Sequence, residues 1–158
     1  MGEEIYQKAL EYAKKKHEGQ FRIGGAPFIV HPIAVAEILR QDGKQVEYRV
    51  AAVFHDLGKI SIDKAILNKP GKLTKEEFEI MKTHTVIGAE MLEQLGIYQN
   101  EPLVKIAHQI CRWHHERYDG KGYPDGLVGD EIPISAQVVS VADVYDALAS
   151  ERVYKKAV

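Results

Sequence analysis

The chain is almost free of cysteine, with Cys111 as its single thiol. One cysteine cannot form a disulfide framework within the chain, and it cannot supply the several thiolates of a structural zinc cluster. We therefore expect a reducing, cytoplasmic environment. A metal site in this chain would have to use imidazole and carboxylate ligands.

Long apolar runs, blocks of one charge and internal repeats are also missing. No stretch is long and apolar enough to cross a bilayer, and the amino terminus lacks the apolar region of a signal peptide. The formal net charge is −2, and no lysine-rich block indicates a nucleic-acid partner. We expect one soluble domain over residues 1–158, without a membrane or nucleic-acid partner.

Apolar residues recur with helical spacing along most of the chain, and no stretch alternates long enough to predict a β-sheet. The sequence therefore predicts an all-α bundle of about six to seven helices. Thr74 and Glu77 form a capping-box pattern before the longest helix, and Gly58 is expected to end the preceding helix. The predicted helices span approximately residues 3–18, 31–41, 46–58, 74–96, 101–115 and 133–150.

Apolar helix faces are interrupted by histidine or aspartate at several places. His84 lies on an apolar side of the longest predicted helix, and Asp143 lies among alanine and valine on the last one. His55 and Asp56 follow the apolar run AAVF directly. A buried carboxylate must be paired with a cation or bound to a metal, because burying it unpaired is prohibitively costly. Taken singly, each position also has a structural interpretation, such as a core histidine bonded to a backbone carbonyl.

The stretch RWHHERYDGKGYPDG adds two adjacent histidines, His114 and His115, at the end of another predicted helix. Imidazole and carboxylate groups bind zinc, iron or manganese, and helical bundles often bring such ligands together from facing helices. The pattern therefore predicts a metal site to which several helices contribute. The DGKGYPDG part is also compatible with a simple turn-rich loop.

Three motifs resemble the HD-GYP branch of the HD phosphohydrolase superfamily: HDLGKI, KPGKLTKEEFEIMKTHTVIGAEML and HHERYDGKGYPDGLVGDEIP…VADVYDALASERVYKKA. The resemblance runs from about Ala51 to Ala157, two-thirds of the chain. It implies an all-α, metal-dependent phosphohydrolase, and many members of this branch hydrolyse cyclic di-GMP. The motif positions correspond to His55, Asp56, Lys59, His84, His114, His115, Asp143 and the triplet Gly122, Tyr123 and Pro124.

The first third, HEGQFRIGGAPFIVHPIAVAEIL, is similar to the opening of the stringent-response (p)ppGpp hydrolases, which are also HD proteins. That resemblance implies His17 as a further metal ligand. The chain has Gly58 and Lys59 where those hydrolases carry an acidic pair. It also departs from the usual HD-GYP pattern at Thr85, Gln137 and Val153, and it stops before the helices that normally follow.

The resemblance implies two divalent metal ions, iron or manganese, with zinc or nickel as alternatives. We expect one ion among His17, His55, Asp56 and Asp143 and the other among His84, His114 and His115. Asp56 would bridge the two ions, since a carboxylate offers two oxygens. Two such ions can activate a water for in-line attack on a phosphate.

Asp56 and Lys59 are the expected catalytic residues, with Lys59 also neutralising a phosphate oxygen. Gly122, Tyr123 and Pro124 are expected to form a rim over the pocket, next to a guanine base or a regulatory partner domain. We interpret His31 as a cap of the second helix beside Pro32, and His108 as structural.

Three functions follow from this interpretation. The first is a phosphodiesterase acting on cyclic di-GMP or a related cyclic dinucleotide. The second is a phosphohydrolase acting on (p)ppGpp or another nucleotide. The third is a signalling module that binds metal or nucleotide without turnover, although such a module need not keep seven ligands.

Overall fold

The computed structural model describes residues 2–22, 25–95 and 100–149. In these ranges the only β-structure is two isolated bridges, Phe21 with Pro27 and Asp119 with Val128, so the predicted all-α fold is confirmed. The described helices are α1 (Gly2–Lys16), α2 (Val30–Gln41), α3 (Val46–Phe54), α4 (Lys64–Leu67), α5 (Lys75–Glu93), α6 (Pro102–Trp113) and α7 (Ile134–Ala149), with the 3₁₀ helices η1 (Leu57–Ser61) and η3 (Gly129–Glu131).

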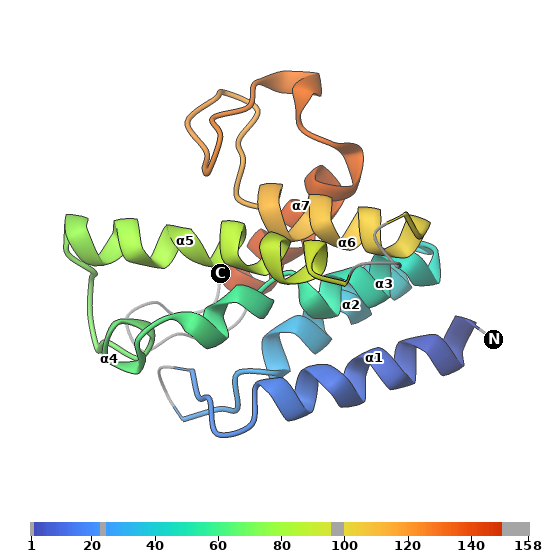
Figure 1. The fold of residues 1–158 in the computed structure, drawn as a ribbon, viewed down its shortest axis with the longest axis horizontal. Coiled ribbons are helices and arrows are strands. Elements are labelled where there is room, and N and C mark those ends of the chain that lie inside the picture. The colour runs from blue at the N-terminus through green and yellow to red at the C-terminus, as the bar shows by residue number, and fades with distance from the viewer. Residues whose placement is uncertain (1, 23–24, 96–99, 150–158) are drawn as a thin grey trace.

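Helix α3 lies at the centre of the bundle. It packs against α1, α2 and α6, and α5 packs along α6 and against η1 (Figure 1). Helix α7 closes the bundle against α2 and α6. The segment between α6 and α7 projects from the bundle at the top of Figure 1. The end of α3, η1 and the facing parts of α5, α6 and α2 therefore surround one region.

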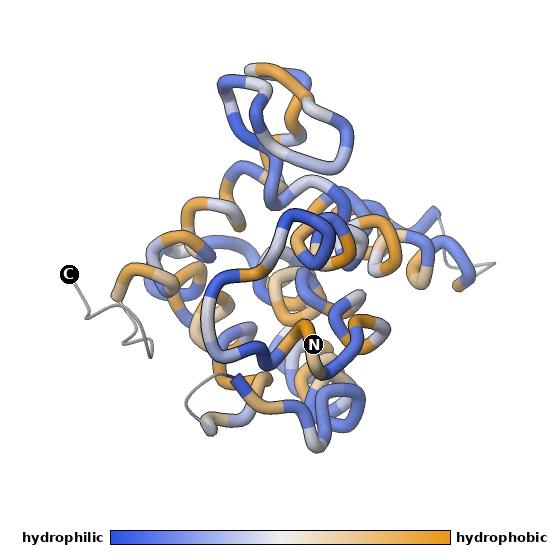
Figure 2. Tube along the Cα trace, turned by 90° about the vertical axis from the view of Figure 1, so that its left-hand side faces the viewer, coloured by the Kyte–Doolittle hydropathy of each residue, from blue (hydrophilic) through white to orange (hydrophobic). Residues whose placement is uncertain are grey.

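Small apolar residues dominate the interior of the bundle. In Figure 2, hydrophobic and hydrophilic residues alternate along the helical parts of the tube, a pattern typical of helices that turn one apolar side to a core. Alanine lets helix axes approach closely, so the polar groups at the ends of α3 and α6 come within reach of α2, α5 and α7. The buried core includes Val35, Ala36, Val50, Ala51, Ala52, Val53, Ala89, Ala107, Ile110, Cys111, Val139 and Ala142.

Two apolar stripes that the helical spacing predicts are partly exposed. The spacing of Phe78, Met81, Leu92 and Leu95 predicts a core stripe, but Phe78 and Leu95 are 45% and 44% exposed. On α7, Val141 and Tyr145 share a stripe by their spacing, but they are 72% and 61% exposed. The buried side of α7, which packs against α2 and α6, instead carries smaller apolar residues together with polar ones; it includes Ser135, Ala136, Val139, Ala142 and Asp146.

The beginning of α5 agrees with the prediction, whereas the end of α3 does not. Thr74 and Glu77 form the predicted capping box. Helix α3 ends at Phe54 with His55 as its C-cap, so Gly58 does not stop it and instead lies within η1. A Cβ atom on Gly58 would lie 1.9 Å from the backbone oxygen of His84. Gly58 is therefore required by the close approach of η1 to α5.

Among the helices of the described ranges, none has the length and apolarity needed to cross a bilayer. The predicted end of the longest helix near Gly96, and the departure at Val153, lie outside the described residues.

Candidate metal centre

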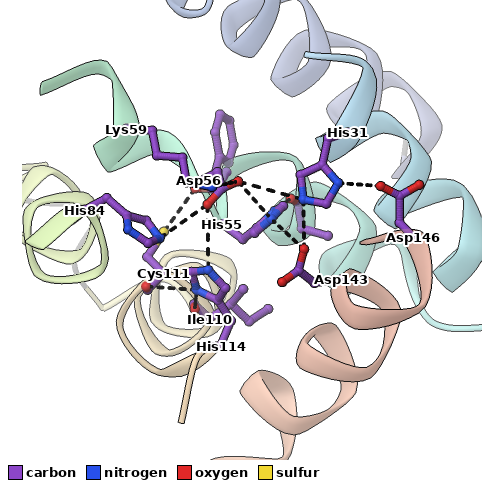
Figure 3. Close-up of polar contacts among 12 residues, drawn as sticks. His31, His55, Asp56, Lys59, His84, Ile110, Cys111, His114, Asp143 and Asp146 are labelled. Carbon is purple, nitrogen blue, oxygen red and sulfur yellow. Dashed lines mark hydrogen bonds and ion pairs between the residues drawn. The ribbon is translucent and has the colours of Figure 1, made fainter. Parts of the chain in front are cut away.

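Histidine and aspartate side chains from five parts of the chain converge around Asp56 (Figure 3). In Figure 3 Asp56 lies between His84 and His114 on one side and His31 and Asp143 on the other. His55 and Asp56 occupy the tight connection between α3 and η1, whereas His114 and His115 follow α6. Helix ends and one-turn connections thus bring residues from distant parts of the sequence together.

The ligand atoms form two groups in which all atoms lie within 4.8 Å of one another. Asp56 belongs to both groups. Its Oδ1 lies 3.4 Å from His84 Nε2 and 3.7 Å from His114 Nε2. Its Oδ2 lies 3.4 Å from His55 Nε2 and 3.8 Å from His31 Nε2. The groups consist of Asp56, His84, His114 and His115, and of His31, His55 and Asp56.

Three of these rings have their tautomer determined by the backbone of their own helix. Nδ1 of His55 lies 2.6 Å from the carbonyl oxygen of Ala52, and Nδ1 of His84 lies 2.6 Å from that of Met81. Nδ1 of His114 lies 2.8 Å from the oxygen of Ile110. A carbonyl only accepts, so each Nδ1 donates its proton and each neutral ring presents a lone pair at Nε2.

These Nε2 atoms are buried and have no hydrogen-bond partner among the described residues. Asp56 Oδ1 is likewise buried without a partner. Burial lowers the pKa of His55 to about 4 and also lowers the pKa of His84, so these rings are neutral near pH 7. Lone pairs that face a carboxylate without a donor are unfavourable unless a cation lies between them. The atoms present therefore fit a metal ion.

His31 is the site residue that the sequence interpretation missed. Its Nε2 lies 2.8 Å from Asp143 Oδ1, and its Nδ1 lies 2.6 Å from Asp146 Oδ2. Burial alone would lower the pKa of His31, but its bonds with the two carboxylates outweigh burial and raise that pKa. The predicted capping role is wrong, because Ile29 is the N-cap of α2 and the His31 side chain points to α7. The available signal was its place in the first turn of a helix whose next turns are apolar.

Asp143 and Asp56 are both held in the charged form. Burial favours the neutral form of Asp143, but the bond with His31 and the proximity of His55 lower its pKa overall. Burial also opposes the charge on Asp56, and the nearby Lys59 ammonium and His55 hold its pKa well below the usual range. Lys59 donates a 2.7 Å hydrogen bond from Nζ to Asp56 Oδ2. The second carboxylate oxygen of Asp56 remains available to a cation.

His17 is buried next to the Phe28 ring, and its Nδ1 lies 2.7 Å from Gln20 Oε1. Its Nε2 has no hydrogen-bond partner among the described residues. Neither group of ligand atoms includes His17, so its ligand role stays a prediction. His108 lies away from the centre, 2.8 Å from a Glu93 carboxylate oxygen.

The Gly122–Pro124 triplet lies beside the centre, and its residues are half-buried. The Tyr123 ring stacks on the His115 ring at a centroid distance of 4.8 Å. Burial raises the pKa of Tyr123, and the charges of Asp56 and Asp143 raise it further. Its predicted contact with a substrate or partner stays a prediction.

A cavity of about 460 Å³ opens onto the centre. His31, His115 and Asp143 line its polar side, and Lys59 and Arg22 add two cations. Its apolar walls include Phe21, Phe28, Leu67, Met81, Val144 and Leu148. Its size and its apolar walls with a few convergent polar groups are those of a small-molecule site.

The family model for the HD domain matches residues 30–158. Among characterised proteins, the chain is 45% identical over 144 residues to the cyclic di-GMP phosphodiesterase response regulator RpfG of Xanthomonas campestris pv. campestris (strain 8004). It is 52% identical over 109 residues to a cyclic di-GMP phosphodiesterase of Thermotoga maritima. It is 45% identical over 105 residues to the 3'3'-cGAMP-specific phosphodiesterase 2 of Vibrio cholerae.

These matches cover 87%, 69% and 66% of the chain, respectively. They cover only 37%, 28% and 19% of the corresponding relatives. The similarity therefore concerns one region of longer proteins.

Proposed function

The chain belongs to the HD domain family, in its HD-GYP branch, and we propose that it is a metal-dependent phosphodiesterase that hydrolyses cyclic di-GMP or a related cyclic dinucleotide. The proposal is supported by the relatives, which are phosphodiesterases of cyclic di-GMP or of 3'3'-cGAMP. It is supported independently by the arrangement of donor atoms around Asp56.

The main structural support for a metal site is a set of buried donor atoms without hydrogen-bond partners. Nε2 of His55, His84 and His114 and Oδ1 of Asp56 lack hydrogen-bond partners among the described residues, although all four atoms are buried. Leaving each such atom unpaired costs about 1–3 kcal/mol, which a bound cation removes. A purely structural bundle would have no use for four such atoms in one place.

We assign His31, His55, Asp56 and Asp143 to one divalent ion, and Asp56, His84, His114 and His115 to a second. His31 takes the place that the sequence interpretation gave to His17, because its ring lies within the group. The two oxygens of Asp56 face the two groups, which favours a bridging role. When bound, the ions would supply the charge that makes water nucleophilic at neutral pH and polarises a phosphate.

The other residues would bind and orient the substrate. Lys59 and Arg22 place two cations in the cavity, which matches the two phosphates of a cyclic dinucleotide. The apolar walls would exclude water and receive the bases. Hydrolysis joins the water oxygen to phosphorus and breaks one P–O ester bond, whose oxygen leaves with a proton.

A nucleotide such as (p)ppGpp is the second candidate substrate. One observation favours it: Phe21, Arg22 and Phe28, from the segment similar to the (p)ppGpp hydrolases, all line the cavity. The two substrates differ in the bond that is broken, so product identification separates them.

The test is metal content of anaerobically purified protein, measured on the sample that is then offered cyclic di-GMP, 3'3'-cGAMP and ppGpp separately. We expect two ions per chain and turnover of a cyclic dinucleotide. Asp56→Ala should remove both metal and turnover, whereas Asp130→Ala, at an exposed aspartate of η3, should change neither.

Turnover of ppGpp alone would favour the second candidate substrate over a cyclic dinucleotide. Two ions without turnover of any of the three would favour a binding module. Activity retained by Asp56→Ala would contradict the bridging role of this carboxylate.

A further inference from the structure

His115 is held differently from the other rings of the centre. His55, His84 and His114 are oriented by backbone carbonyls, and His31 by Asp146. Within the described part of the chain, no hydrogen bond involves the His115 ring, whose ring contacts are with His84, His114 and Tyr123. A ligand without a polar anchor has a less restricted ring orientation.

Tyr123 supplies that missing restraint through its ring face. The two rings are 28° from parallel at a centroid distance of 4.8 Å, which is the geometry of an offset stack. The contact is reinforced by the backbone, because Tyr123 N donates a hydrogen bond to the carbonyl oxygen of His115. Tyr123 is therefore attached to His115 through both its backbone and its ring.

Tyr123 is itself fixed from the side of α5. The Phe78 ring meets it edge to face at 6.0 Å, and Lys82 Nζ lies 5.8 Å from its centroid. Lys82 also lies 5.4 Å from the Phe78 centroid. Phe78, although 45% exposed, therefore packs against the loop that carries Tyr123.

The loop backbone leaves little freedom to Tyr123. A Cβ atom on Gly122 would lie 2.3 Å from Arg117 N and 2.4 Å from Glu116 Cα, so the loop packs directly on the chain that leaves α6. The buried Glu116 carboxylate accepts hydrogen bonds from the backbone N–H groups of Asp125, Gly126 and Leu127. The end of α6, which carries His115, and the loop that carries Tyr123 thus form one unit.

We propose that Tyr123 is a positioning residue for metal binding, and that its ring stack orients His115 towards the ion shared with His84 and His114. The inference rests on the metal site of the proposed function, but not on turnover or on the identity of the substrate. It gives the tyrosine of the Gly122–Pro124 loop a role inside the protein, distinct from contact with a nucleotide or a partner.

The test is isothermal titration calorimetry, in which metal-stripped protein is titrated with Mn²⁺ in the absence of nucleotide. Tyr123→Ala should weaken one of two Mn²⁺ sites by about 10–100-fold, the range typical for removing a group that supports a metal ligand. The other site should be unchanged. Tyr123→Phe keeps the ring and should bind both ions like the unaltered protein.

Tyr118→Ala is the matched control, since Tyr118 belongs to the same loop but is 66% exposed. It should leave both sites intact. If Tyr123→Ala does not fold, Tyr123→Leu removes the aromatic ring while keeping apolar volume, and the same loss at one site is expected.

Unchanged Mn²⁺ binding by Tyr123→Ala would overturn the inference, as would an equal loss in Tyr123→Phe, which would implicate the hydroxyl instead. Two Mn²⁺ sites in the unaltered protein without turnover would contradict the proposed function while leaving the inference intact. The absence of Mn²⁺ binding by the unaltered protein would contradict both.

Discussion

His31 and Asp143 join the beginning of α2 to α7 through a 2.8 Å contact between Nε2 and Oδ1. Asp146, one turn further along α7, binds the opposite nitrogen of the same ring. With both nitrogens directed at carboxylates, the ring is stabilised as an imidazolium. In the metal-free protein, these bonds therefore favour the charged form of His31, in the position that we assign to a ligand of the first ion.

Replacing His31 with Ala should remove metal from the first group and leave Asp143 and Asp146 as two close carboxylates without their common partner. We expect metal content to fall from two ions to one and phosphodiesterase turnover to be lost. His108→Ala, a histidine outside the cluster, serves as the control and should retain both ions. If His31→Ala kept both ions, His17 would instead be favoured as the ligand of the first ion.

The metal-stripped protein should lose stability as the pH falls from about 6.5 towards 4. Burial lowers the pKa of His55 to about 4 and also lowers that of His84, so the unfolded chain takes up protons in this window before the folded chain does. The lowered pKa of His55 alone corresponds to a loss of about 3 kcal/mol in the free energy of unfolding. The contribution of His31, whose pKa is raised, is already complete below pH 6.5 and does not offset the loss.

Urea unfolding of the stripped protein at several pH values in this range measures the effect. A free energy of unfolding that stays constant from pH 7 to 4.5 would contradict the burial of neutral rings.

Gly58→Ala should disturb both stability and metal binding. Its Cβ would lie 1.9 Å from His84 O and 2.7 Å from Gly88 N, and backbone atoms of a packed helix cannot move away easily. We expect a loss of about 1–3 kcal/mol or more in the free energy of unfolding, with weaker binding at the group that contains His84. Denaturant unfolding and Mn²⁺ titration measure the two effects, and Ser61→Ala, at an exposed position of η1, is the control.

Cys111 should be unreactive in the folded protein. It is fully buried, its Sγ lies 3.2 Å from the carbonyl oxygen of Phe54, and burial raises its pKa. The thiolate, which is the reactive form, is therefore scarce at pH 8. A thiol reagent such as iodoacetamide should label the denatured chain but not the native one, and rapid native labelling would contradict this burial.

The sequence predicted the helices well because their periodicity is a local property. The capping box of Thr74 and Glu77 and the all-α fold class could be predicted without tertiary information. The face of α7 was assigned incorrectly because the largest apolar residues were assumed to be buried. In the structure, the buried side of α7 is the one that carries Ala136, Val139 and Asp146, because it packs on α2 and α6 and bonds His31 through Asp146.

The candidate site was also predictable in part. Ordered motifs identified His55, Asp56, His84 and the adjacent histidines. His55 and the adjacent histidines lie at helix ends, whereas His84 interrupts an apolar side of α5. His31 and Asp146 were missed because each lies within an ordinary helix, α2 and α7 respectively, and only the packing of α2 on α7 brings them together. No residue spacing along the chain contains that information.

The carbonyl bonds of His55, His84 and His114 make the direction of each lone pair a property of a single helical turn. An isolated turn that forms in a partly folded chain would already aim its imidazole correctly. Tertiary folding then has only to set the three distances between these rings, which the closely packed, alanine-rich contacts between helices can hold within a narrow range. A substitution that separates α3 from α6 should accordingly increase the distances between the donor atoms without changing their directions. Metal affinity should then fall gradually as the helices move apart.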